Sequence, residues 1–111
     1  MLVIEFDPQE HNYLLVEEEP YFVLRTSEAR HVVTRDRCPH RGGPLHLGKW
    51  NDRTKSLTCP WHGTCLTAMA LRRRAVPSVR CCDTITAVFP VPPDTPVQRL
   101  QRMVLANGNV H

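Results

Sequence analysis

Two short stretches dominate the sequence, Cys38-Pro39-His40-Arg41-Gly42 and Cys59-Pro60-Trp61-His62-Gly63. Each offers one thiolate and one imidazole, spaced C-x-H in the first stretch and C-x-x-H in the second. Two Cys and two His placed in this way can bind a metal centre. A structural zinc ion takes four such ligands, whereas a two-iron cluster can take two thiolates on one iron and two imidazoles on the other. The C-x-H spacing departs from usual zinc-finger spacing, so the cluster is the favoured interpretation.

The two stretches resemble the signature of Rieske [2Fe-2S] proteins. The first continues to give C-P-H-R-G-G-P-L, and the second reads C-P-W-H-G. They look most like oxygenase-associated Rieske ferredoxins. Subunits of respiratory complexes carry an additional Cys in each loop, joined in a disulfide, whereas this chain has Gly43 and Trp61 there. The resemblance covers the chain from about residue 12 to about residue 90.

This resemblance implies one [2Fe-2S] cluster per chain and assigns its ligands. Cys38 and Cys59 would bind the inner iron, and His40 and His62 would bind the outer iron, where the reducing electron resides. Neighbouring residues would cover the flanks of the cluster or, in the case of the threonine, donate a hydrogen bond toward it: Pro39, Leu45, Pro60, Trp61 and Thr64.

The rest of the sequence predicts an all-β fold. Short apolar runs alternate with turn-forming residues at the spacing of a small antiparallel sandwich or barrel. The predicted strands cover residues 2–6, 13–16, 21–25, 31–34 and 84–89, with a hairpin between 49–51 and 56–59. The resemblance implies the Rieske fold, in which an antiparallel β-sandwich base carries a smaller cluster-binding subdomain. We therefore expect a Rieske domain over residues 1–90, with the cluster-binding subdomain at about 36–66.

The sequence of residues 91–111 predicts a Pro-rich linker and a short C-terminal helix. Thr95-Pro96-Val97-Gln98 has the pattern of a capping box, with Pro at the first helical position. Val97, Leu100 and Val104 would share one helical face, and Asn107-Gly108 is a typical helix stop. A helix of about ten residues is marginal alone, so we expect it to pack on its own sandwich or, alternatively, to form a dimer or partner contact.

Length and composition place limits on the protein class. The 111 residues suit one small domain. No apolar run approaches the ~20 residues of a membrane-spanning helix, and the N-terminus lacks the features of a signal peptide, so we expect a cytoplasmic protein. Its five Cys favour metal binding over disulfides. Cys65, Cys81 and Cys82 are interpreted as small buried or idle thiols.

The charge is unevenly distributed along the chain. Residues 1–30 carry seven acidic residues against two Arg, a sum of −5, and residues 31–111 carry twelve Lys and Arg against four Asp, a sum of +8. The basic part, which contains both motifs, is either a solvated surface or a surface that attracts an acidic partner protein. Nucleic acid is a weaker candidate, because the basic residues are scattered and no aromatic platform accompanies them.

The function expected from the resemblance is a Rieske ferredoxin, which carries single electrons from a flavin-dependent reductase to a terminal oxygenase and is not itself an enzyme. We expect no membrane or nucleic-acid partner, and a monomer or a weak dimer through the C-terminal helix.

One alternative is the Rieske domain or subunit of a multicomponent oxygenase. Such an enzyme also needs a mononuclear iron bound by two His and a carboxylate on a second domain, and 111 residues leave no room for that domain. The others are a zinc-binding interaction module and a cluster-free relative. His46 is expected to be a surface residue and not a ligand.

Overall fold

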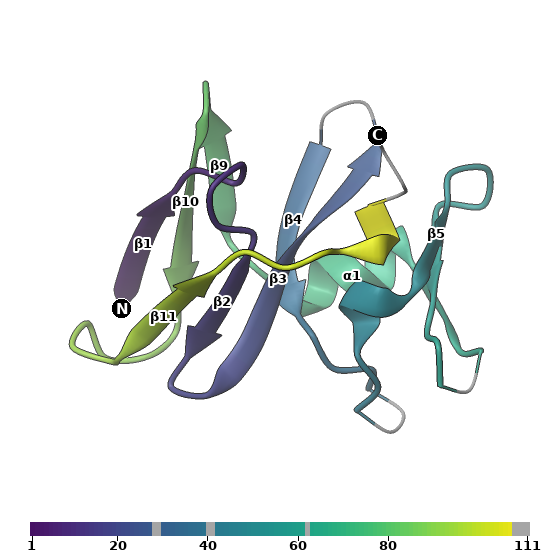
Figure 1. The fold of residues 1–111 in the computed structure, drawn as a ribbon, viewed down its shortest axis with the longest axis horizontal. Coiled ribbons are helices and arrows are strands. Elements are labelled where there is room, and N and C mark those ends of the chain that lie inside the picture. The colour runs from purple at the N-terminus through teal and green to yellow at the C-terminus, as the bar shows by residue number, and fades with distance from the viewer. Residues whose placement is uncertain (28–29, 40–41, 62, 108–111) are drawn as a thin grey trace.

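Three antiparallel sheets and one α-helix make up the computed structural model, which describes residues 1–27, 30–39, 42–61 and 63–107 (Figure 1). One sheet has the strand order β1 (Leu2–Phe6), β10 (Thr84–Phe89), β9 (Ser78–Cys81). The second has the order β11 (Val97–Leu100), β2 (Tyr13–Val16), β3 (Glu19–Ser27), β4 (Arg30–Arg35), β8 (Ala75–Val76). The third has the order β5 (Lys49–Asn51), β6 (Ser56–Thr58), β7 (Cys65–Thr67). The all-β prediction is therefore confirmed.

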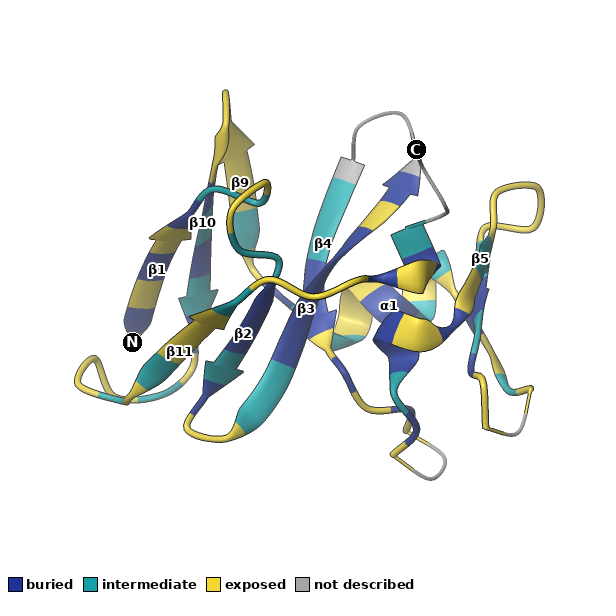
Figure 2. Cartoon of the chain, viewed as in Figure 1, coloured by how far each residue is buried: buried dark blue, intermediate teal, exposed yellow. Residues whose placement is uncertain are grey.

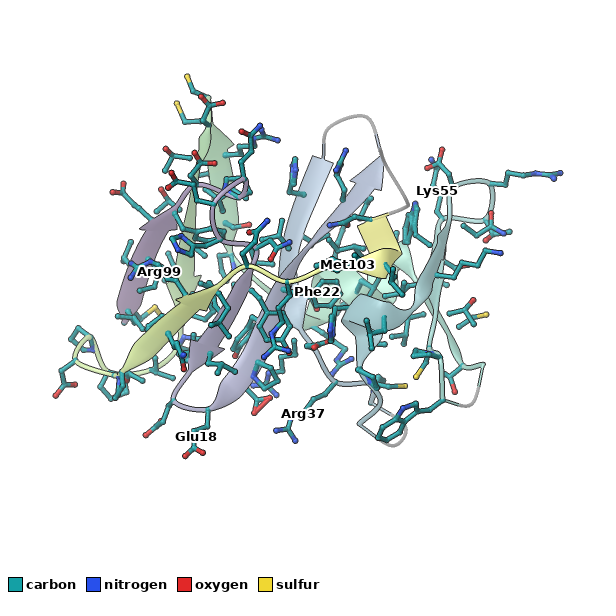
Figure 3. All side chains as sticks on the ribbon, in the orientation of Figure 1. Glu18, Phe22, Arg37, Lys55, Arg99 and Met103 are labelled. Atoms are coloured by element: carbon teal, nitrogen blue, oxygen red, sulfur yellow. The ribbon has the colours of Figure 1, made fainter. Side chains whose placement is uncertain are left out.

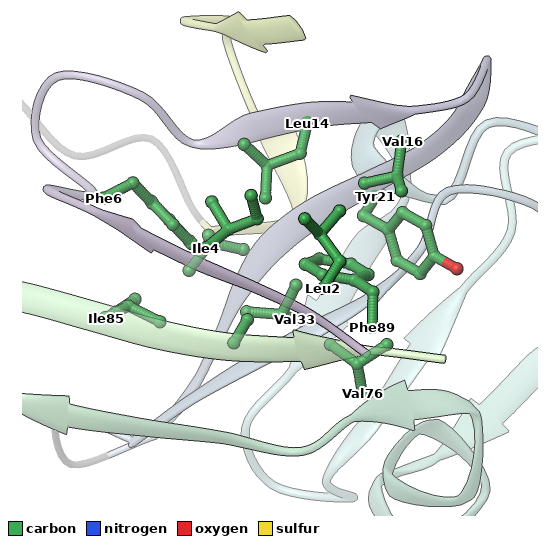
Figure 4. Close-up of a cluster of buried hydrophobic side chains, with 12 residues drawn as sticks. Leu2, Ile4, Phe6, Leu14, Val16, Tyr21, Val33, Val76, Ile85 and Phe89 are labelled. Atoms are coloured by element: carbon green, nitrogen blue, oxygen red, sulfur yellow. The ribbon is translucent and has the colours of Figure 1, made fainter. Parts of the chain in front are cut away.

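The first two sheets enclose one hydrophobic core and form the base of the molecule (Figure 4). Strand β1 shows how the sequence builds it, because alternate residues of a strand face opposite sides. Leu2, Ile4 and Phe6 are buried and the residues between them are exposed, which gives the banded pattern in Figure 2. The core is completed from the second sheet and from β10 by Leu14, Val16, Tyr21, Val23, Val33, Val76, Ile85, Ala87 and Phe89.

A second core lies on the other side of β3, between the base and the third sheet. Tyr21 and Val23 face the first core, whereas Phe22 and Leu24 are fully buried in the second (Figure 3 labels Phe22). The third sheet contributes Leu57 and Leu66 to this second core. Both Cys of the two motifs also belong to it, so β3 separates the structural core from the one that holds the candidate site.

The predicted C-terminal helix is wrong. Residues Val97–Leu100 form β11, which pairs antiparallel with β2 and places Val97 opposite Val16. The hydroxyl of Thr95 does not cap a helix; it donates to the carbonyl of Pro92 at 2.7 Å. The chain then continues to a short 3-10 helix, η2 (Leu105–Asn107). A dimer through a C-terminal helix therefore has no structural basis in the described residues.

The described residues form one α-helix, α1 (Ala68–Arg74), in a stretch where no helix was predicted. Thr67 caps it by accepting a hydrogen bond from the backbone N–H of Ala70 at 3.1 Å. Leu71 is fully buried and anchors the helix in the second core. None of the described helices is long and apolar enough to cross a membrane.

Candidate metal centre

The first motif begins three residues after the end of β4 and closes into a tight loop. The backbone N–H of Cys38 donates to the carbonyl of Gly43 at 2.9 Å, and the N–H of Gly42 donates to the carbonyl of Cys38 at 2.7 Å. Gly42 has a φ of 74°, in the left-handed region that glycine adopts without strain. A 3-10 helix, η1 (Leu45–Leu47), follows the loop. The loop thus holds its Cys at a fixed point between β4 and η1.

The second motif, between β6 and β7, repeats this backbone design. The N–H of Cys59 donates to the carbonyl of Thr64 at 2.8 Å, and the N–H of Gly63 donates to the carbonyl of Cys59 at 3.1 Å. Gly63 has a φ of 69°. In both loops the glycine four residues after the Cys donates back to that Cys, so two equivalent loops each fix one thiol.

The two loops are in direct contact at Gly43. A Cβ atom on this glycine would lie 2.7 Å from Sγ of Cys59 and 3.2 Å from the ring of Trp61. A real Cβ does not approach another heavy atom so closely. The backbone of the first loop is therefore packed against the thiol of the second, which brings the two motifs to one place.

Both thiols are buried in the second core. Cys38 is 4% exposed and Cys59 is 2% exposed, and neither is in a disulfide. The three other cysteines, Cys65, Cys81 and Cys82, are exposed and lie outside this core. The buried pair thus differs from the remaining thiols, and the exposure of those three rules out the interpretation of them as small buried residues.

The residues expected to cover the site divide into an inner and an outer group. Leu45 is fully buried in the same core as the two thiols, and Thr64 is half-buried. Pro39, Pro60 and Trp61 are exposed, with 58% of Trp61 accessible. The outer group therefore forms a rim on the surface around two thiols that are shielded from water.

The predicted imidazole ligands, His40 and His62, lie outside the described residues. Among the residues that are described, no group of three or more His, Cys, Asp or Glu gathers in a metal-binding arrangement. What the structure does provide is two buried, unpaired thiols on two glycine-bearing loops in contact. This arrangement fits a cluster that takes two thiolates on one iron and is completed by two imidazoles.

A family model of the Rieske [2Fe-2S] domain matches residues 2–91. The chain belongs to this family. Its cofactor is accordingly a [2Fe-2S] cluster and its function is iron–sulfur electron transfer, as the two motifs predicted. The chain gives no significant match to a curated protein or to a solved structure. The family match ends before β11, so the C-terminal strand and η2 are additions to the region that the family shares.

The structure also shows a buried polar group that the sequence did not predict. His46 was expected on the surface, but it is 9% exposed, and it lies beside Asp36 and Tyr13. The hydroxyl of Tyr13 donates to the Asp36 carboxylate. Burial, together with the hydrogen bond to Asp36, raises the pKa of Tyr13, so the hydroxyl remains protonated and acts as a donor. No local pattern in the sequence marks this group, because its members come from three separate segments.

Thr64 allows a test of how the second loop tunes the cluster. Hydrogen bonds donated toward cluster or Cys sulfur stabilise the reduced state and raise the reduction potential. The Thr64 backbone carbonyl accepts a hydrogen bond from the N–H of Cys59. A substitution at Thr64 keeps this backbone bond and changes only the side-chain hydroxyl. We expect Thr64→Val to lower the reduction potential in protein-film voltammetry, and Thr64→Ser to restore it. An unchanged potential in Thr64→Val would contradict this role.

Proposed function

We propose that this protein is a Rieske ferredoxin, which accepts single electrons from a flavin-dependent reductase and delivers them to a terminal oxygenase. The observation that supports the proposal is the exposed rim of Pro39, Pro60 and Trp61 around two buried thiols. A carrier must exchange electrons with two partners in turn, and such a rim leaves the loops open to both. The proposed location is the cytoplasm, where thiols remain reduced.

The ligand set of this proposal is Cys38 and Cys59 on one iron and His40 and His62 on the other. Imidazole is neutral where thiolate is negative, so the iron that carries it is the easier one to reduce. The two thiolates bind from within the second core, where Leu45 and Leu57 exclude water. The electron is then held on the side where the histidines bind.

The charge of the cluster-binding region supports an acidic partner surface. Arg37 lies directly before Cys38, is exposed at the lower side of the molecule in Figure 3, and has its Nε 3.4 Å from Oε2 of Glu19. On the third sheet and α1 the exposed cations are Lys49, Arg53, Lys55, Arg72 and Arg73, of which Lys55 is paired with Asp52 at 3.0 Å. Charges of one sign on a surface accelerate association with a partner of the opposite sign, and the effect falls with ionic strength.

The test is anaerobic reduction of the purified chain, followed by EPR spectroscopy and stopped-flow mixing with candidate reductases and oxygenases. We expect a reduced-state Rieske EPR signal and transfer of one electron per chain. His62→Cys should retain a cluster, if any, at a much lower potential, because thiolate replaces neutral imidazole. A colourless protein with one zinc per chain, or an unchanged potential in His62→Cys, would contradict the proposal.

A further inference from the structure

Asp36 connects the two ends of the first ligand loop. It follows the last residue of β4 and precedes Cys38 by two residues. Its Oδ1 accepts a hydrogen bond from the backbone N–H of His46 at 2.7 Å, and its own N–H donates to the carbonyl of Pro20 in β3 at 2.9 Å. The carboxylate therefore bridges the point where the loop leaves the sheet and the point where it enters η1.

The second carboxylate oxygen is also paired. Oδ2 of Asp36 accepts from the hydroxyl of Tyr13, which belongs to β2. Nδ1 of His46 lies 2.6 Å from the same oxygen, without the alignment of a hydrogen bond. The rings of Tyr13 and His46 meet edge to face with centroids 5.2 Å apart. With side-chain exposures of 2% for Asp36 and 11% for His46, the charged group is shielded from water.

The C-terminal segment beyond the family match covers this group. The guanidinium of Arg102 lies 4.7 Å from the centre of the Tyr13 ring. Arg102 is itself fixed by Asn12, whose side chain accepts from the Arg102 N–H at 2.9 Å and donates to its carbonyl at 2.8 Å. Val104 and Ala106 then enter the second core beside the two motif cysteines. The segment that follows β11 thus packs Arg102 on Tyr13, the residue whose hydroxyl donates to the buried carboxylate.

We propose that Tyr13, Asp36 and His46 are positioning residues, which form a buried clamp that closes the first ligand loop and fixes the environment of its Cys and His. The inference rests on the proposed ligation by Cys38 and His40. Hydrogen bonds to a buried charged group are costly to break, because the charge then lies unpaired in a medium of low polarity. The clamp therefore fixes the two points at which the chain leaves β4 and enters η1, and its negative charge lies beside them.

The test uses the full chain with its cluster and two substitutions of opposite electrostatic effect. Asp36→Asn removes the negative charge and is expected to raise the reduction potential. Tyr13→Phe leaves the charge but removes its donor, so the potential is expected to fall. Both variants should lose the visible absorbance of the cluster to a chelator about tenfold faster, which corresponds to one lost hydrogen bond to a charged group.

The matched control is Thr34→Val. Thr34 lies on β4 two residues before Asp36, is fully buried, and has a hydroxyl with no hydrogen-bond partner among the described residues. This variant should keep the wild-type potential and chelation rate. The clamp would be overturned if Thr34→Val lost its cluster to the chelator as fast as the clamp variants. It would also be overturned if both clamp variants kept the wild-type potential and chelation rate.

Two further outcomes separate the clamp from the proposed ligation. If Asp36→Asn does not fold, Tyr13→Phe decides, because a potential that falls supports the clamp and one that stays at the wild-type value overturns it. If the wild-type chain gives no Rieske EPR signal, the ligation itself fails and the clamp fails with it. If the wild-type chain gives a Rieske signal but both clamp variants keep its potential and chelation rate, the clamp is overturned and the proposed ligation stands.

Discussion

Cys59→Ser is expected to yield a colourless protein that contains no [2Fe-2S] cluster. In a Rieske cluster two thiolates hold one of the two irons, and a serine hydroxyl is not deprotonated at neutral pH. Cys59 is 2% exposed and lies at the contact between the two loops, so no other described cysteine can take its place. Iron and sulfide analysis should give close to zero per chain, and Cys38→Ser should give the same result.

The chain offers a control for this experiment in Cys65. It lies six residues after Cys59, is exposed, and has its Sγ 3.6 Å from the hydroxyl of Thr58. Cys65→Ser should therefore retain a full cluster with an unchanged absorption spectrum. Stoichiometric iron in Cys59→Ser, or cluster loss in Cys65→Ser, would show that the ligand assignment is wrong.

Much of the fold could be predicted because its signals are local. The strands Leu2–Phe6 and Tyr13–Val16 have the predicted bounds, and the hairpin of β5 and β6 pairs as expected. Each of these elements is marked by apolar residues bounded by turn formers within a few positions. The two Cys were recognised from the same kind of short-range pattern.

The C-terminal helix was predicted wrongly because its signals were also local. The structure of this segment depends instead on pairing with a strand that is distant in the sequence. Thr95 and Pro96 do resemble a helix start, but β2 would otherwise be left as an unpaired edge. Pairing Val97 with Val16 supplies that strand with a partner and buries apolar surface. Tertiary pairing here outweighs a weak helical preference.

The buried position of His46 could not be predicted for a related reason. Nothing adjacent to His46 indicates a carboxylate, since Asp36 lies ten residues earlier and Tyr13 lies in another strand. Only the fold brings these residues together. Short motifs therefore identified the cofactor, while the residues that hold its loop in place become visible only when strands distant in sequence meet.

Gly43→Ala is expected to remove most of the cluster while the base of the molecule remains folded. The added Cβ would lie 2.7 Å from Sγ of Cys59, below any ordinary contact, and 3.2 Å from the ring of Trp61. Trp61 is exposed and can move away, but Cys59 is buried and its N–H is bound to the carbonyl of Thr64. The thiol must therefore move from the position in which it is proposed to bind iron. Overpacking of this kind costs about 1–3 kcal/mol.

Gly42→Ala separates this steric effect from backbone strain. Gly42 has a φ of 74° and no atom within 4 Å of its would-be Cβ. Ala there costs about 1–2 kcal/mol through its left-handed conformation, so it should lower the thermal midpoint without touching Cys59. Iron content measured beside thermal unfolding then distinguishes the two glycines. Gly43→Ala should lose iron at temperatures where Gly42→Ala, of similar stability, retains it; equal iron content in both would mean that contact between the loops does not position the thiolate.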